Sequence, residues 1–243
     1  MRRQITLVPV VLLVALVIAA CGSSSAAPST SSSSSTSSTS SAAASSSAAA
    51  SSTSSTPSLG HSTTAASGPR TGFEGVPLEP GPPLGSAATT RTGTVDGITC
   101  APVEQLNYHI HAHLTVYVNG RPYSLPAGIG IPGSMDEQTQ QGPLAVGGQC
   151  YYWLHTHTSD GVIHVESPTA RIYALGDFFD EWHQRLSATQ VASVHGHITA
   201  FVNGRRWQRS LRAIPLIPHE DIQFDIGAPV SPLVGVNWSQ TGL

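Results

Sequence analysis

Three histidines and a glutamate gather in the stretch from residue 155 to residue 166. His155 and His157 are separated by one residue, and His164 and Glu166 follow after the segment Thr158 to Gly161, which ends in Asp-Gly. Two short alternating runs joined by such a segment are typical of a β-hairpin. Imidazole and carboxylate groups are ligands that suit Zn(II), Cu(II), Ni(II) or Fe(II). The stretch therefore predicts a metal site.

The register of this hairpin decides whether the three imidazoles meet. Residues two apart in a strand share a face, so His155 and His157 lie together. If the loop has four residues, residue 155 is paired with residue 164 across the two strands. If the turn has two residues, residue 157 is paired with residue 164. Both registers place His164 on the same face as His155 and His157. Opposed Cβ atoms are about 5 Å apart, which lets three imidazoles reach one ion. Glu166 would be a fourth ligand, a group that orients the ligands, or a general base.

Two other segments, 111–121 and 195–205, repeat a histidine pattern almost letter for letter, and each ends in Asn-Gly-Arg. Alternation of apolar and polar residues predicts strands with one core face and one histidine face, each turned by the Asn-Gly pair. The simplest interpretation is an internal duplication of a β-hairpin. If the two copies meet about a pseudo-two-fold axis, a second site with four nitrogens would form. Its ligands would be His111, His113, His195 and His197.

The recurrence of the histidine pairs favours metal over solvated or cross-strand bonded imidazoles. Methionine occurs only at Met1 and Met135, which argues against a Cu(I) site built from soft ligands and leaves zinc or copper. The metal could be buffered, sensed or delivered by a binding module. Two alternatives stay open. One is a metalloenzyme, a hydrolase or oxygenase in which Glu166 is the base, and the other is a metal-free interaction domain of the cell envelope.

The N-terminus has the features of an export signal. Arg2 and Arg3 precede an apolar run from Leu7 to Ala20 that ends at Cys21. These fourteen residues fall short of the roughly 20 that cross a bilayer. The four residues ending at Cys21 resemble the lipobox of bacterial lipoproteins. That resemblance implies removal of residues 1–20, acylation of Cys21 with chains such as palmitate, and membrane lipid as a partner at the cell surface.

Composition divides the rest of the chain. Residues 21–90 are rich in Ser, Ala and Thr and then in Gly and Pro, which predicts a disordered tether. Residues 91–243 are enough for one domain with a real core. This part holds twelve Asp and Glu against eight Arg. The absence of a basic excess argues against a nucleic-acid partner.

Once Cys21 is lipidated, only Cys100 and Cys150 remain. An even pair in an oxidising compartment predicts a disulfide. The alternative, a pair of thiolate metal ligands, is less favoured because neither cysteine belongs to a CxxC motif.

The expected fold is mostly β, an α+β domain with one short helix, arranged as a β-sandwich or barrel. The helix should begin at Asp177, since Phe179, Trp182 and Leu186 recur with helical spacing. The residues from Cys150 to Phe179 resemble a group of His-rich exported bacterial proteins, and this resemblance implies no activity. Strands are expected at 107–118, 121–125, 151–157, 162–166, 171–175, 194–202 and 222–226.

Overall fold

The computed structural model describes residues 70–243. The export signal, Cys21, His61 and most of the expected tether lie outside the described residues. Within residues 70–243, no helix is both long and apolar enough to cross a membrane.

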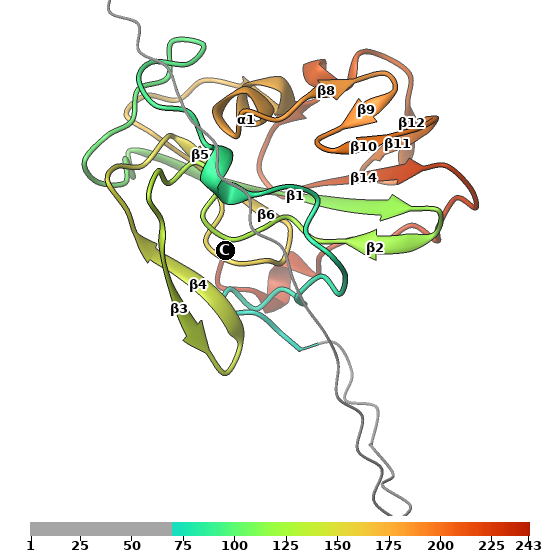
Figure 1. Cartoon of the computed structure of the whole chain (residues 1–243), viewed down its shortest axis with the longest axis horizontal. Coiled ribbons are helices and arrows are strands. Elements are labelled where there is room, and N and C mark those ends of the chain that lie inside the picture. Colours follow the sequence, from blue (N-terminus) through green and yellow to red (C-terminus); the bar gives the residue numbers. More distant parts are fainter. Residues whose placement is uncertain (1–69) are drawn as a thin grey trace, which may run out of the picture. The chain divides into compact units, whose positions relative to one another are not determined.

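The described region is mostly β and has one short helix, as expected (Figure 1). The strands are β1 (Tyr108–Val118), β2 (Arg121–Tyr123), β3 (Met135–Thr139), β4 (Gly142–Gly147), β5 (Leu154–His155), β6 (Val162–Ser167), β7 (Tyr173–Ala174), β8 (Leu186–Ser187), β9 (Gln190–Val191), β10 (Val194–His195), β11 (Ile198–Val202), β12 (Arg205–Trp207), β13 (Pro215–Leu216) and β14 (Glu220–Ile226). The helices are α1 (Leu175–Glu181) and three short 3-10 helices, η1 (Ala87–Thr89), η2 (Leu211–Ala213) and η3 (Trp238–Gln240).

A seven-stranded mixed sheet forms the centre of the structure. Its strand order is β12-β11-β14-β1-β6-β5. Strand β1 is long enough to pair with two strands along the same edge, with β6 along residues 108–113 and with β2 along residues 116–118. Only the β1–β14 pair in this sheet is parallel. The small sheets are β10-β9-β8, β13-β7 and β3-β4. None of the sheets in residues 70–243 closes into a barrel.

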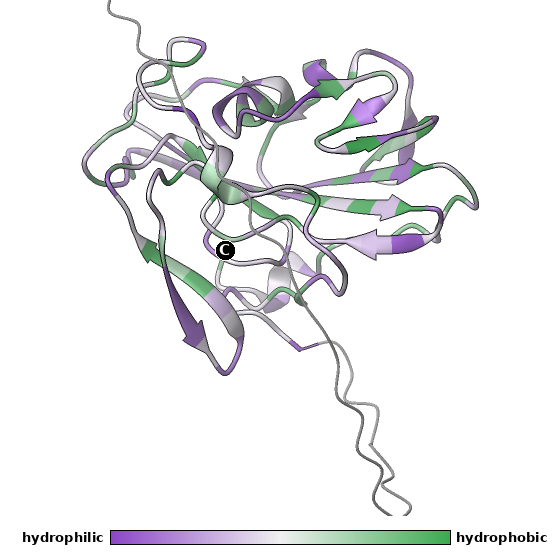
Figure 2. Cartoon of the chain, in the orientation of Figure 1, coloured by the Kyte–Doolittle hydropathy of each residue, from purple (hydrophilic) through white to green (hydrophobic). Residues whose placement is uncertain are grey.

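The alternation in β1 sorts its side chains as the sequence predicts. Ala112, Leu114 and Val116 are fully buried in the main core, while the histidines point to the other face. Hydrophobic and hydrophilic residues alternate along the central strands (Figure 2). Three aromatic residues, two in α1 and one directly after it, complete the core on the apolar face of the sheet. These are Phe178, Phe179 and Trp182.

The helix begins earlier and ends earlier than the sequence predicts. Asp177 lies in its first turn, where the carboxylate accepts a hydrogen bond from the backbone N–H of Ala174 at 3.0 Å. The helix cannot continue past Trp182 because His183 has a left-handed backbone, with φ of 59°. Leu186 therefore belongs to β8.

The expected strand over 151–157 is reduced to two residues. Around it, the backbone bonds instead to a loop: Tyr152 N–H donates to the carbonyl of Gly130, and Thr156 N–H donates to that of Ile129. Gly130 makes this approach possible, because it has φ of 76° and a Cβ there would lie 2.2 Å from the carbonyl oxygen of Leu154. The loop thus fixes the backbone on both sides of His155.

Replacement of Gly130 with alanine should destabilise the protein, since the new Cβ meets backbone that cannot move aside. Gly97→Ala is the matched control, because Gly97 has φ of 78° and no atom within 4 Å of a built Cβ. We expect Gly130→Ala to lower the free energy of unfolding by about 1–3 kcal/mol more than the control does. Urea unfolding of both variants measures the difference, and equal losses would show that the close approach is unimportant.

Packed structure begins before residue 90, although the folded domain was expected to start at residue 91. Val76 and Leu84 are buried, and Leu84 N–H donates to the carbonyl of Ser124. Glu79 accepts from Leu125 N–H at 3.1 Å. Composition does not reveal this, because a Gly- and Pro-rich segment can bury single side chains without forming a periodic element. The segment 70–90 also carries Glu74, which contacts His164 of β6.

Candidate metal centre

A row of three imidazoles crosses the centre of the polar face of the sheet. In the register of the strands, His164 of β6 is paired with His111 of β1 on one side and with His155 of β5 on the other. The ring centroids of His164 and His111 are 4.6 Å apart, and those of His164 and His155 are 5.4 Å apart. The observed pairing of residues 155 and 164 is the one that the four-residue loop predicts.

His157 and Glu166 complete a first cluster with His155 and His164. The ring centroid of His157 lies 4.8 Å from that of His155 and 4.7 Å from that of His164. One possible ligand atom from each of the four side chains lies within 4.8 Å of the others. His155, His164 and Glu166 are buried, and His157 is partly exposed. These four residues are the ones that the hairpin predicts.

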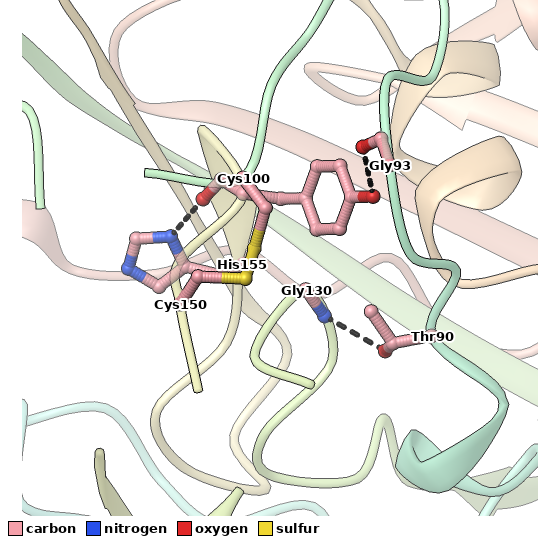
Figure 3. Close-up of a disulfide and its surroundings, with 7 residues drawn as sticks. Thr90, Gly93, Cys100, Gly130, Cys150 and His155 are labelled. Carbon is pink, nitrogen blue, oxygen red and sulfur yellow. Dashed lines mark hydrogen bonds between the residues drawn. A yellow bond between two sulfur atoms is a disulfide. The ribbon is translucent and has the colours of Figure 1, made fainter. Parts of the chain in front are cut away.

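The tautomers of His155 and His157 follow from their backbone partners. Nδ1 of His155 lies 2.9 Å from the carbonyl oxygen of Tyr152, and Nδ1 of His157 lies 2.9 Å from that of Ala145 in β4. A carbonyl oxygen only accepts, so each Nδ1 donates and each neutral ring carries its lone pair on Nε2. Figure 3 shows His155 held in this way close to the disulfide. Metal-binding histidines are commonly oriented by such a bond.

The two Nε2 atoms face each other at 3.2 Å. Two lone pairs cannot form a hydrogen bond with each other. Burial strongly lowers the pKa of His155, assisted by the charges of His157 and His164, so a hydrogen bond between the two atoms would require a proton on Nε2 of His157. In a tetrahedral site with Zn–N bonds of about 2.0–2.1 Å, two nitrogen ligands are about 3.3 Å apart. The separation therefore suits a shared metal ion.

His164 is held between two glutamates. Its Nε2 donates to Oε1 of Glu74 at 2.8 Å, and its Nδ1 lies 3.4 Å from Oε1 of Glu166. Burial opposes protonation of the ring, yet the nearby carboxylates of Glu166 and Glu74 prevail and raise the pKa of His164 to about 9. With Nε2 engaged by Glu74, Nδ1 is the atom that can bind a metal.

A second cluster lies on the other side of Glu166. It consists of His109, His111 and His164, which offer ligand atoms within 4.8 Å of one another. Nε2 of His109 lies 3.1 Å from Oε1 of Glu166, and Nε2 of His111 is buried with no hydrogen-bond partner. Burial, together with the charge of His164, lowers the pKa of His111 to about 3. His111 is thus a neutral ring whose buried Nε2 has no hydrogen-bond partner.

Two carboxylates that contact the clustered histidines were not predicted from the sequence. Glu74 lies in the segment assigned to the tether. Glu104, whose Oε1 is 3.4 Å from Nε2 of His157, lies four residues after Cys100. The predicted disulfide was the available signal for Glu104, since it ties that segment to the chain leading into His155 and His157. His109 shares the face of His111 in the strand pattern but was not assigned to a site.

Three of the histidines assigned to the second predicted site lie elsewhere. His113 is buried, and its Nε2 bonds to the carbonyl oxygen of Asp160 at 2.8 Å, which holds the hairpin loop. His195 and His197 are exposed. Strands β1 and β11, which contain the two similar segments, do not meet, because β14 lies between them and pairs with both. The structure brings His111 together with His109 and His164.

The predicted disulfide between Cys100 and Cys150 is present, with Cα atoms 5.5 Å apart. The adjacent residues Ala101 and Tyr151 also form a β-bridge. Together these links hold the segment of Glu104 against the chain that leads to His155.

Buried clusters of histidine and glutamate that could bind a metal ion are therefore present in this protein. Comparisons of the chain with protein-family models, with curated proteins and with solved structures gave no match.

Proposed function

We propose that this protein is a metal-binding module that holds a divalent ion, zinc or copper, with His155, His157, His164 and Glu166. The observation that carries the proposal is the contact of the two Nε2 atoms at 3.2 Å. The Nδ1 atoms of His155 and His157 are fixed by backbone carbonyls, so in the neutral rings the two Nε2 lone pairs point toward each other. A bound cation turns this unfavourable contact into coordination.

The composition of the cluster supports the choice of metal. Imidazole nitrogens with a carboxylate suit Zn(II) and Cu(II) and disfavour Cu(I), which prefers sulfur. The cluster also has a route for the ion. The side chain of His157 is 16% exposed and that of Glu104 is 34% exposed, whereas His155 is fully buried. An ion can thus first meet Glu104 and His157 and then move inward to His155.

The test is elemental analysis of the purified full chain after loading with zinc or copper and removal of free metal. We expect at least one ion per chain. The same measurement on a double variant, His155→Ala with His157→Ala, should give no tightly held ion at the first cluster. Absence of bound metal from the wild-type chain under every loading condition would overturn the proposal.

We also propose that the module is exported and anchored to the membrane through acylated Cys21. The lipobox-like sequence supports this, and the disulfide is consistent with an oxidising compartment. The test is cell fractionation of the wild-type chain and the Cys21→Ala variant, combined with labelling by radioactive palmitate. Wild-type protein should be labelled and sediment with membranes, and the variant should carry no label. Equal labelling of both would refute the anchor.

Metal binding should release a proton from His164. Because its pKa is raised to about 9, this ring is mostly protonated at pH 7.5, and Nδ1 must lose its proton before it binds an ion. Affinity should therefore fall by up to about tenfold for each pH unit below 9, for the one proton displaced. Calorimetry at pH 7.5 in buffers of different ionisation enthalpy measures the release.

Glu74→Gln provides the comparison, since it removes one carboxylate that raises the pKa of His164. The variant should release fewer protons at pH 7.5. Identical proton release in the variant would show that Glu74 does not control the protonation of His164.

A further inference from the structure

The second cluster has the features of a metal site of its own. Nε2 of His111 is buried, has no hydrogen-bond partner and belongs to a side chain that is only 7% exposed. Its ring centroid is 4.5 Å from that of His109 and 4.6 Å from that of His164. An unpartnered buried nitrogen among other imidazoles is costly unless a cation or water completes it.

Glu166 lies between the two groups of imidazoles and presents one oxygen to each. Its Oε1 is 3.1 Å from Nε2 of His109 and 3.4 Å from Nδ1 of His164. Its Oε2 lies 3.8 Å from Nε2 of His155 and has no hydrogen-bond partner. The side chain is 3% exposed, so water does not compete freely for these oxygens. A carboxylate in this position can bind two ions at once.

His164, by contrast, cannot serve two ions. Its Nε2 is bonded to Glu74, which leaves Nδ1 as its only free nitrogen, and that atom lies on the Oε1 side of Glu166. When both clusters are filled, His164 belongs with His109 and His111. Glu104, whose Oε1 is 3.4 Å from Nε2 of His157, lies outside the four-residue cluster and would have to approach His155 to supply the fourth ligand on the other side.

From these contacts we propose that the protein holds a pair of metal ions bridged by the carboxylate of Glu166. One ion is bound by His155, His157, Glu104 and Oε2 of Glu166. The other is bound by His109, His111, His164 and Oε1 of Glu166. The inference rests on the proposed function and extends it from one ion to two.

The negative charges of the carboxylates at the two clusters are balanced better by two divalent ions than by no ion. Three carboxylates, those of Glu74, Glu104 and Glu166, lie against the five imidazoles. Two divalent cations would nearly balance their three negative charges, and both Glu74 and Glu166 keep a buried oxygen without a partner. Buried charges of this kind require compensation.

The test is the stoichiometry of Cu(II) bound to the full chain, measured by equilibrium dialysis, together with electron paramagnetic resonance. Wild-type protein should bind two ions and give the half-field signal of a coupled pair, as expected for ions a few ångströms apart. His109→Ala is the first variant, because its side chain is 37% exposed and its loss should leave the fold intact. It should bind one ion and lose the half-field signal, and His111→Ala should do the same.

His195→Ala is the matched control, an exposed histidine outside both clusters, and should keep two ions and the coupled signal. A single ion in wild-type protein, unchanged by His109→Ala, would overturn the bridged pair and leave the proposed function standing. Two ions without magnetic coupling would also overturn it. The variants His109→Ala, His111→Ala and His195→Ala all keep His155 and His157. If any of them bound no metal at all, the proposed function would be refuted instead.

Discussion

Replacement of His155 with alanine should lower the affinity for the first metal ion by at least a hundredfold. The loss of groups that merely orient a ligand costs roughly 10- to 100-fold, and His155 is a fully buried proposed ligand that faces His157 at 3.2 Å. The variant leaves a cavity that no neighbouring imidazole can fill, because His157 is fixed by the carbonyl of Ala145. Competition with a chromogenic chelator at pH 7.5 measures the affinity.

Two variants serve as controls for this result. His195→Ala removes an exposed imidazole outside both clusters and should retain wild-type affinity. His113→Ala removes a buried histidine that bonds to the hairpin loop, so it reports the effect of general loosening near the site. Wild-type affinity in His155→Ala would contradict the assignment, and so would an equal loss in all three variants.

Reduction of the Cys100–Cys150 disulfide should lower the free energy of unfolding by about 4 kcal/mol. The two cysteines are 50 residues apart, and a cross-link over such a loop restricts the unfolded chain by about this amount in the chain-entropy model. Urea unfolding with and without reductant, on protein whose free thiols have been counted, measures the difference. The double variant Cys100→Ala with Cys150→Ala should lose as much and should not respond to reductant.

The disulfide also links stability to the site. It holds Glu104 near His157, so the reduced protein should bind metal more weakly than the oxidised protein, even under conditions in which both are folded. A wild-type unfolding curve after verified reduction would contradict the stabilising role. Unchanged metal affinity in the reduced, folded protein would show that the segment of Glu104 is held by other contacts, such as the bridge between Ala101 and Tyr151.

Local sequence determined the faces of the side chains in β1 and in the hairpin of β5 and β6. Because side chains alternate along a strand, the spacing of His155 and His157 and the length of the loop to His164 predicted that the three would share a face, and the pairing of residues 155 and 164 confirms it. The apolar face of β1 and the disulfide were likewise predictable, the first from alternation and the second from an even pair of cysteines.

The spacing of residues within one strand did not predict which residues of other strands would lie beside them. The same alternation placed His111 and His113 on one face, but their neighbours differ. His111 of β1 is paired with His164 of β6, whereas His113 lies at the hairpin loop and bonds to the carbonyl oxygen of Asp160. Likewise, the likeness of segments 111–121 and 195–205 suggested that the copies meet, yet β14 separates them.

The amino-acid sequence by itself determined that a histidine-rich hairpin would present three imidazoles and a glutamate together. Only the tertiary structure decided which other groups join them. Glu74 comes from a Gly- and Pro-rich segment 90 residues before His164, Glu104 is brought in through the disulfide, and His109 and His111 arrive with β1 because that strand pairs with β6. Strand order and the path of covering segments depend on burial throughout the domain, which no short stretch of sequence encodes.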